Sequence, residues 1–297
     1  MTLPPLYKYL DVEGAKLTLR NGNFRHAKPS EFNDLEDLTI RSIFPESEDA
    51  ALQEIKDNFS DVSLNNLDRA PTCINLQMRQ QVALIQRAYR ENPDAARAIK
   101  ERTKNDTIST LYDLDGLKQR SKGYVEEINN FMQGFRVLCV SQENSSMQMW
   151  TRYAQDSQGI VLRILPSASR DSKFLRFRKV EYCLTRPPLY KNVLAFLESG
   201  LFGDQEKRIR DVMDDIIYSK TLEWEYEDEY RLVIPILDGH DWRLMPYYPD
   251  EIPELYLGHK ASDEIKAELI ELAKKRNPEI RIFHSCIDPS GRLLFLQ

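Results

Sequence analysis

The sequence predicts an α+β fold with a mostly antiparallel sheet. Short strand-like segments lie towards both ends of the chain and helical segments lie between them, without regular βαβ alternation. No glycine-rich phosphate loop of the Rossmann or Walker type is present, which disfavours those enzyme classes. The 297 residues are 41% apolar, enough for a sizeable core. We expect one domain, 1–297, with a helix-rich insertion at about 45–133.

The beginning of the chain is predicted to form strands. Residues 6–10, 16–20 and 23–27 are short and rich in residues that favour strands. Asn21-Gly22 separates the last two segments and is a typical hairpin turn. Residues 29–33 are predicted to form a loop.

The middle of the chain has the spacing of apolar residues that is typical of helices. Helices are predicted over four segments: 49–59, 74–92, 95–102 and 112–133.

The part of the chain after residue 133 is predicted to contain both strands and helices. Strands are expected at 136–141, 159–164, 174–182, 230–236, 254–258, 281–284 and 293–296. Helices are expected at 147–154, 189–199, 204–219 and after Ser262, which can cap a helix. The helix at 204–219 presents a core face of Ile209, Val212, Met213, Ile216 and Ile217.

Composition excludes several classes of protein. With 41 Lys and Arg against 47 Asp and Glu, the net charge of −6 argues against a general duplex-DNA binder. The four cysteines form no CxxC pair, and the four histidines are widely spaced, so we expect free thiols and no metal site. We find no signal peptide and no apolar run long enough for a membrane span. A cytoplasmic protein is expected.

The densest polar feature is the segment 224–235, WEYEDEYRLVIP. In an extended chain Glu225, Glu227, Glu229 and Arg231 share one face. Carboxylates at this spacing repel one another unless a cation or a ligand lies among them. One interpretation is a solvated edge strand protected from aggregation by its acids. The other is an acid that enters a cleft at the start of the core strand, where it is held rigidly and can touch a substrate.

Two further segments are candidates for a binding site. Arg20, Arg25 and Lys28 lie around a tight turn and could meet a diphosphate, or they are the surface charges of an ordinary hairpin. Trp150 and Tyr153 share a helical face and could stack on a base or a nicotinamide, or pack on the core.

A basic stretch lies at 170–186. It is either a solvated sheet face or a local track for a phosphate backbone, which the overall acidity allows because the stretch is local. Ser141, at the end of a strand, is a possible pocket residue.

Several of these segments together resemble a widespread bacterial family of unassigned function. LYKYL, PSEFNDLE, MWTRYA followed by GIVLRI, and WEYEDEYRL are similar to the family's YKY, PxxFNDPxE, MWxxYAxxxxG and KxxxWxYExExR segments. The similarity spans most of the chain outside about 45–133. Leu35 stands where the family often has Pro.

The last segment also resembles the catalytic strand of ADP-ribosyltransferases of the toxin and bacterial-defence type. That resemblance implies a split antiparallel sheet with a helical insertion, and NAD as substrate. It implies catalytic roles for Glu229, which would face the ribose, and for Glu227, which would activate the acceptor. It implies an NAD-binding set of Lys8, Tyr9, Arg20, Arg25, Asn33, Ser141, Trp150, Tyr153 and Arg231.

The leading hypothesis is therefore an NAD-dependent ADP-ribosyltransferase that modifies a macromolecular acceptor, as a toxin or anti-phage effector. A nucleic-acid acceptor is slightly favoured over a protein, and a neutralising antitoxin or chaperone is a possible partner. Two alternatives stay open. One is another enzyme on a related pocket, a nuclease or an NAD hydrolase, and the other is a non-enzymatic interaction or regulatory module.

Overall fold

The computed structural model describes residues 3–94, 97–98, 114–186, 188–236 and 243–297. The chain divides into two compact units. One unit comprises residues 1–37, 133–184 and 220–297, and it contains the large sheet. The other comprises 38–132 and 185–219 and is helical. The mixed α+β class with a mostly antiparallel open sheet, predicted from the sequence, is confirmed.

The sheet has eight strands in the order β12-β11-β10-β4-β1-β3-β8-β5. Pairing is antiparallel throughout this sheet except between β10 and β11, which are parallel. The strands are β1 (Leu6–Leu10), β3 (Phe135–Ser141), β4 (Ile160–Ile164), β5 (Arg178–Lys179), β8 (Glu229–Pro235), β10 (Glu254–Leu257), β11 (Arg281–Ile287) and β12 (Leu293–Leu296). Smaller ladders join β2 (Asn23–Arg25) to β9 (Leu244–Pro246) and β6 (Glu181–Cys183) to β7 (Ser219–Thr221).

The sheet is opened between β1 and β3. β1 pairs with β4 at five positions and β3 pairs with β8 at seven, but β1 and β3 are joined only at Tyr7 and Ser141. Away from this single pair, residues of both strands line one pocket, among them Lys8 and Tyr9 of β1 and Cys139 of β3.

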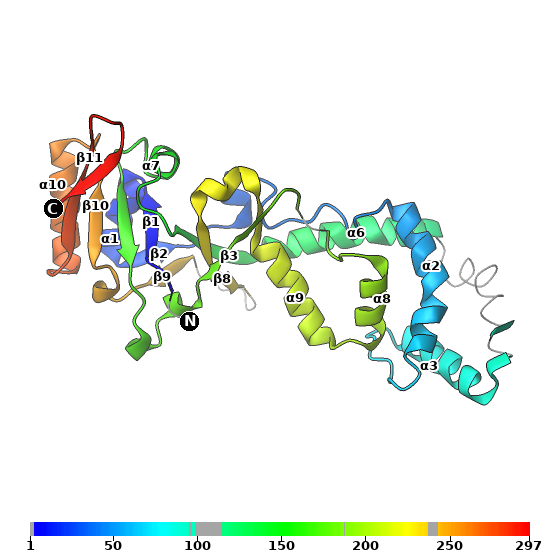
Figure 1. The fold of residues 1–297 in the computed structure, drawn as a ribbon. Helices are drawn as coiled ribbons and strands as arrows, with labels where there is room; N and C mark the ends of the chain where they lie inside the picture. Colours follow the sequence, from blue (N-terminus) through cyan, green and yellow to red (C-terminus); the bar gives the residue numbers. More distant parts are fainter. Residues whose placement is uncertain (1–2, 95–96, 99–113, 187, 237–242) are drawn as a thin grey trace. The chain divides into compact units, whose positions relative to one another are not determined.

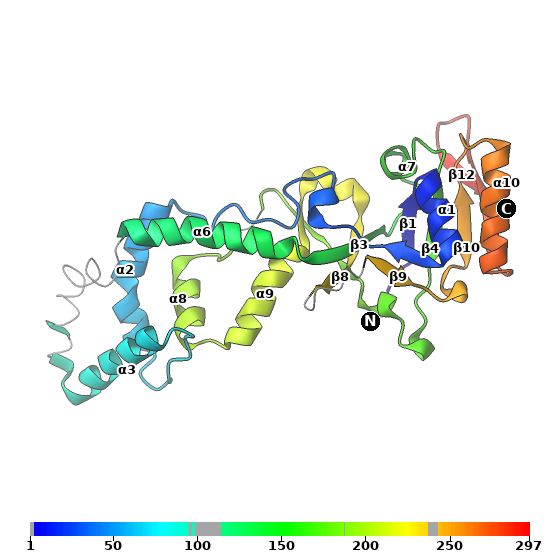
Figure 2. The same cartoon turned by 180° about the vertical axis from the view of Figure 1, so that it is seen from behind.

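Two helices cover one face of the sheet (Figures 1 and 2). They are α1 (Val12–Asn21) and α10 (Asp263–Arg276), and their apolar residues pack with those of β1, β4 and β10 in the main core. The side chain of Ser262 caps α10 by accepting from the N–H of Ile265, as predicted. The short helix α7 (Met147–Tyr153) packs Trp150 against Tyr9 on the other face.

The predicted strand at 16–20 is wrong, because this segment lies in α1. Asp11 caps the helix at its start, and Gly22 ends it with φ +66. Asn-Gly favours both a hairpin turn and a left-handed helix end, so the dipeptide alone does not distinguish them.

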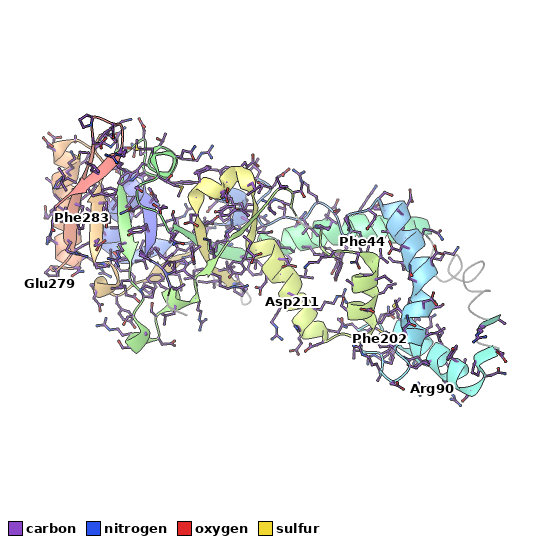
Figure 3. All side chains as sticks on the ribbon, viewed as in Figure 1. Phe44, Arg90, Phe202, Asp211, Glu279 and Phe283 are labelled. Atoms are coloured by element: carbon purple, nitrogen blue, oxygen red, sulfur yellow. The ribbon has the colours of Figure 1, made fainter. Side chains whose placement is uncertain are left out.

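The helical unit contains α2 (Glu48–Asn65), α3 (Leu76–Glu91), α6 (Leu114–Met132), α8 (Val193–Phe202) and α9 (Gln205–Ile217). Phe59 and Val62 of α2 pack with Leu197 and Phe202 of α8, and Figure 3 labels Phe44 and Phe202 in this unit. The unit thus includes most of the predicted insertion together with α8 and α9. Ile209, expected in the core face of α9, is 55% exposed. The helix predicted at 95–102 falls largely outside the described residues.

Candidate functional site

A pocket of about 180 Å³ lies in the opening between β1 and β3. Residues of several segments that are far apart in the sequence line it, β3 among them. They include Tyr7, Lys8 and Tyr9; Phe32, Asn33 and Asp34; Met149 and Tyr153; and Glu227 and Glu229. These last four groups belong to the segments that carry the resemblance described above, so the polar features of the sequence meet at one place.

Glu229 begins β8, opposite Ser141 of β3. The chain reaches it through a short 3-10 helix, Leu222–Glu227, which ends at Asp228 with φ +39. Segment 222–227 is therefore not extended, which corrects the alternation expected for Glu225 and Glu227. Asp228 tolerates the left-handed conformation better than most residues do, and its turn places Glu227 and Glu229 on the same pocket.

Glu229 is held by a buried arginine. Arg231 lies two residues further along β8 and is fully buried. Its Nε donates to Oε1 of Glu229 at 2.8 Å, and a terminal nitrogen donates to Oε2 at 2.9 Å. The same guanidinium donates to both carboxylate oxygens of Asp37, at 3.0 and 2.6 Å. Arg231 thus lies behind the pocket and fixes the orientation of Glu229.

Lys220 forms ion pairs with Glu227 and with the two acids that Arg231 binds. Its Nζ lies 2.5 Å from Glu227, 3.2 Å from Glu229 and 3.5 Å from Asp37. The buried cluster therefore holds three carboxylates and two cations. Tyr153 donates to Oε1 of Glu227 at 2.5 Å, and the hydroxyl of Tyr182 accepts from the backbone N–H of Glu229 at 2.9 Å. Every acid in the cluster has a hydrogen-bonded partner.

The two glutamates have opposite pKa shifts. Burial raises the pKa of Glu227 and the charge of Glu229 raises it further, against the opposing effects of Lys220 and Tyr153. Burial also acts to raise the pKa of Glu229, but the charges of Arg231 and Lys220 outweigh it and hold that pKa below its ordinary value. Paired carboxylates whose environments separate their pKa values are typical of acid–base sites.

Two other polar groups of β1 and β3 complete the pocket. Lys8 donates to the carbonyl of Cys139 at 2.9 Å, and burial lowers the pKa of its ammonium against the attraction of Glu229 and Glu227. Burial raises the pKa of Cys139 well above its ordinary value, which keeps the thiol protonated at neutral pH. Cys139 therefore lacks the thiolate that a nucleophile would need.

The pocket brings together most of the predicted site residues. Its lining includes Lys8, Tyr9, Arg25, Asn33, Ser141, Tyr153, Glu227 and Glu229, with Arg231 behind Glu229. Arg20 and Trp150 do not line it. Arg20 lies on α1 and pairs with Glu268 of α10 at 3.6 Å, and Trp150 is fully buried in the core, where it cannot stack on a ligand.

Lys220 and Asp37 were not predicted. Lys220 precedes the acidic segment and Asp37 follows the FND segment, so each lies beside a feature that drew attention. The family pattern KxxxWxYExExR has its lysine at the position of Lys220, so that motif was a signal for Lys220. The role of Asp37 depends on a tertiary contact with Arg231, which no spacing in the sequence indicates.

The predicted basic track is not a strand face. Arg176 lies in the 3-10 helix Lys173–Arg176, and β5 begins only at Arg178. Arg170 pairs with Asp250 at 2.8 Å and Lys179 pairs with Asp228 at 3.0 Å, so acids offset part of the positive charge.

Within the described residues, no group of three or more His, Cys, Asp or Glu side chains is arranged to hold a metal ion. No helix in the same ranges is both long enough and apolar enough to cross a membrane.

Comparisons with models of protein families, with curated proteins and with solved structures give no match for this chain.

Proposed function

We propose that this protein is an NAD-dependent ADP-ribosyltransferase whose reaction takes place in the pocket between β1 and β3. The observation that carries the proposal is the pair Glu227 and Glu229, which share one pocket and have opposite pKa shifts. Cleaving the bond between ribose and nicotinamide creates an oxocarbenium-like transition state, as glycoside cleavage does. That chemistry needs one carboxylate that stays ionised and one that can accept a proton.

Glu229 fits the first role. Its low pKa keeps it ionised at neutral pH, and Arg231 fixes its orientation. As the bond from C1′ to nitrogen breaks, the electron pair leaves with neutral nicotinamide and positive charge develops on the ribose. The ionised Glu229 carboxylate lines the pocket, and a negative charge fixed there stabilises that transition state electrostatically.

Glu227 fits the second role. The acceptor's oxygen or nitrogen attacks C1′ and its proton passes to the Glu227 carboxylate. A raised pKa makes this carboxylate a stronger base, and general-base catalysis typically contributes about 10²–10⁴-fold in rate. Tyr153 and Lys220 hold the carboxylate in place through hydrogen bonds.

The experiment measures release of nicotinamide from NAD in the presence of total RNA, DNA and protein from cells. We expect Glu227→Gln to lower the rate about 100-fold or more, since glutamine keeps the shape but cannot accept the proton. Glu225→Gln is the matched control, because Glu225 is an exposed acid of the same 3-10 helix. Wild-type protein that neither consumes NAD nor labels any fraction contradicts the proposal.

A second candidate is a non-enzymatic interaction module in which the ionic cluster is structural. Both oxygens of Glu229 are engaged by cations and the residue is only 3% exposed, as in a buried ion pair that stabilises a fold. This candidate predicts no consumption of NAD by the wild type, and loss of stability without any enzymatic readout in the Glu229 variant.

A further inference from the structure

The face of the large sheet opposite α1 and α10 carries aromatic side chains from four strands. They are Tyr7 of β1, Tyr256 of β10, Phe283 of β11 and Phe295 of β12, and we call them the aromatic face. Figure 3 labels Phe283 in this unit, and Figures 1 and 2 show α1 and α10 together on the other side of the sheet. The helix α7 covers part of this face, where Trp150 contacts Tyr9 and Phe295, but Tyr7, Phe283 and Phe295 stay half-buried. An antiparallel sheet normally presents polar residues where a face meets solvent, so the exposed parts of these rings are unusual.

The rings of the aromatic face contact one another. Tyr256 and Phe283 stack with centroids 4.9 Å apart and an interplanar angle of 14°. Tyr7 and Phe295 meet Tyr256 edge-on at 6.0 and 4.8 Å. Tyr256 is buried, whereas Tyr7, Phe283 and Phe295 are half-buried. The cluster therefore leaves aromatic surface available to a ligand.

Two arginines lie beside these rings. Arg163 of β4 and Arg281 of β11 both pair with Glu254 of β10, which is 4% exposed. The side chains of Arg163 and Arg281 are 28% and 52% exposed, and the guanidinium of Arg281 lies 5.8 Å from the Phe283 ring. One carboxylate balances only one of the two cations, so the group is net positive.

The aromatic face leads to the candidate active site. Tyr7 belongs to both, because it also lines the pocket between β1 and β3. In the register of the sheet, Tyr7 lies opposite Arg163, Arg163 opposite Glu254, and Glu254 opposite Arg281. Rings and guanidinium groups thus continue from the pocket across β1, β4, β10 and β11.

We propose that the aromatic face binds single-stranded nucleic acid and delivers it to the pocket as the acceptor. Unpaired bases stack on aromatic rings and on guanidinium planes, and arginine contacts the phosphates. The bases of a duplex are already stacked and cannot reach such rings. The acceptor role rests on the proposed function, whereas binding itself does not.

The test measures binding of fluorescent 12-nucleotide oligo(U) and oligo(dT), and of a duplex of equal length, by anisotropy without NAD. Phe283→Leu keeps an apolar side chain but removes the π-face, and we expect it to weaken single-strand binding about fivefold or more. Arg281→Ala should lower the slope of log K against log salt by about one. Lys275→Ala removes an exposed cation from α10, on the opposite side of the sheet, and should leave binding unchanged.

Each outcome decides one question. Single-strand binding that falls in Phe283→Leu and Arg281→Ala but not in Lys275→Ala supports the aromatic face, even if NAD is never consumed. Equal binding of the duplex, or equal loss in Lys275→Ala, overturns it. Consumption of NAD with labelled protein and no oligonucleotide binding also overturns it, while the proposed function stands. Melting curves confirm that each variant is folded.

Discussion

Arg231 and Glu229 form a two-fold hydrogen-bonded ion pair between residues two apart on the same strand, with donor–acceptor distances of 2.8 and 2.9 Å. Side chains at this spacing share a face, so β8 itself brings them together. The other side of the guanidinium is occupied by Asp37, which lies 194 residues away in the sequence. Glu229 is thus held by Arg231, two residues away in the sequence. Arg231 is in turn held by Asp37, which is distant in the sequence.

The shape of the Arg231 guanidinium should contribute as much to the stability of the fold as its charge does. Lysine supplies one ammonium, which cannot replace the four hydrogen bonds to Glu229 and Asp37. We expect Arg231→Lys to lower the free energy of unfolding, measured by urea denaturation, by about 1–3 kcal/mol for each buried acceptor left without its hydrogen bond. Arg170→Lys, at an exposed pair with Asp250, should change it by no more than about 1 kcal/mol. Equal effects of the two substitutions would contradict this account.

Glu229 should stabilise the fold more at neutral pH than in acid. Its pKa in the folded protein lies below the ordinary value of 4.5, so the native state binds fewer protons than the unfolded state. The stability it contributes is present above that value and is lost as the pH falls through the lower, folded-state pKa. Urea midpoints between about pH 5 and pH 3 should therefore fall less steeply for Glu229→Gln than for wild type. Parallel curves would show that Glu229 has no such role.

The pKa of Glu227 has the opposite sign of shift. Because it is raised, this group contributes stability below its ordinary value of 4.5, and that contribution is lost as the pH rises through the folded-state pKa. If Glu227 is the base, activity should increase with pH over the same range, because only the ionised carboxylate accepts a proton.

Removing the hydroxyl of Tyr153 should shift the pH dependence of the activity. The hydroxyl donates to Glu227 and lowers its pKa, so Tyr153→Phe should raise the pKa and shift the acid limb of kcat/KM to higher pH. Tyr247→Phe is the control, since its hydroxyl donates to the carbonyl of Thr18, away from the pocket. If the acid limb of kcat/KM is unchanged in Tyr153→Phe, Glu227 is not the base.

Gly159 should not tolerate a side chain. A Cβ at this position would lie 2.0 Å from the carbonyl oxygen of Leu10, on the backbone of the neighbouring strand. We expect Gly159→Ala to destabilise the protein by about 3 kcal/mol or more, because backbone must move to relieve the clash. Nearby, Asp156 has φ +51, so Asp156→Gly should change the melting temperature little. Similar losses for both substitutions would contradict this explanation.

The sequence predicted the elements whose signals are local. The Ser262 cap and the strands at 136–141 and 230–236 correspond to α10, β3 and β8 in the structure. The prediction was wrong at Asn21-Gly22, because this dipeptide is typical both of a hairpin turn and of the end of a helix. It was also wrong at 222–227, where a single residue in the left-handed conformation, Asp228, ends a 3-10 helix that alternation of polar and apolar residues does not indicate.

The site was predicted in part for the same reason. Glu227, Glu229 and Arg231 are close in the sequence, so their proximity could be expected. Lys220 and Asp37 join them only in the folded protein. The resemblance put Trp150 in the NAD-binding set, whereas its own spacing also allowed packing on the core, and its contact with Tyr9 takes it into the core.

The contact between Asp37 and Arg231 also has a consequence for how the pocket forms. Closing a loop of 194 residues requires most of the chain to be synthesised before the contact can be made. Contacts with such long sequence separation slow folding and tend to form after local helices. The pocket should therefore be completed late, and a kinetic refolding experiment should recover helical signal before any binding or activity returns.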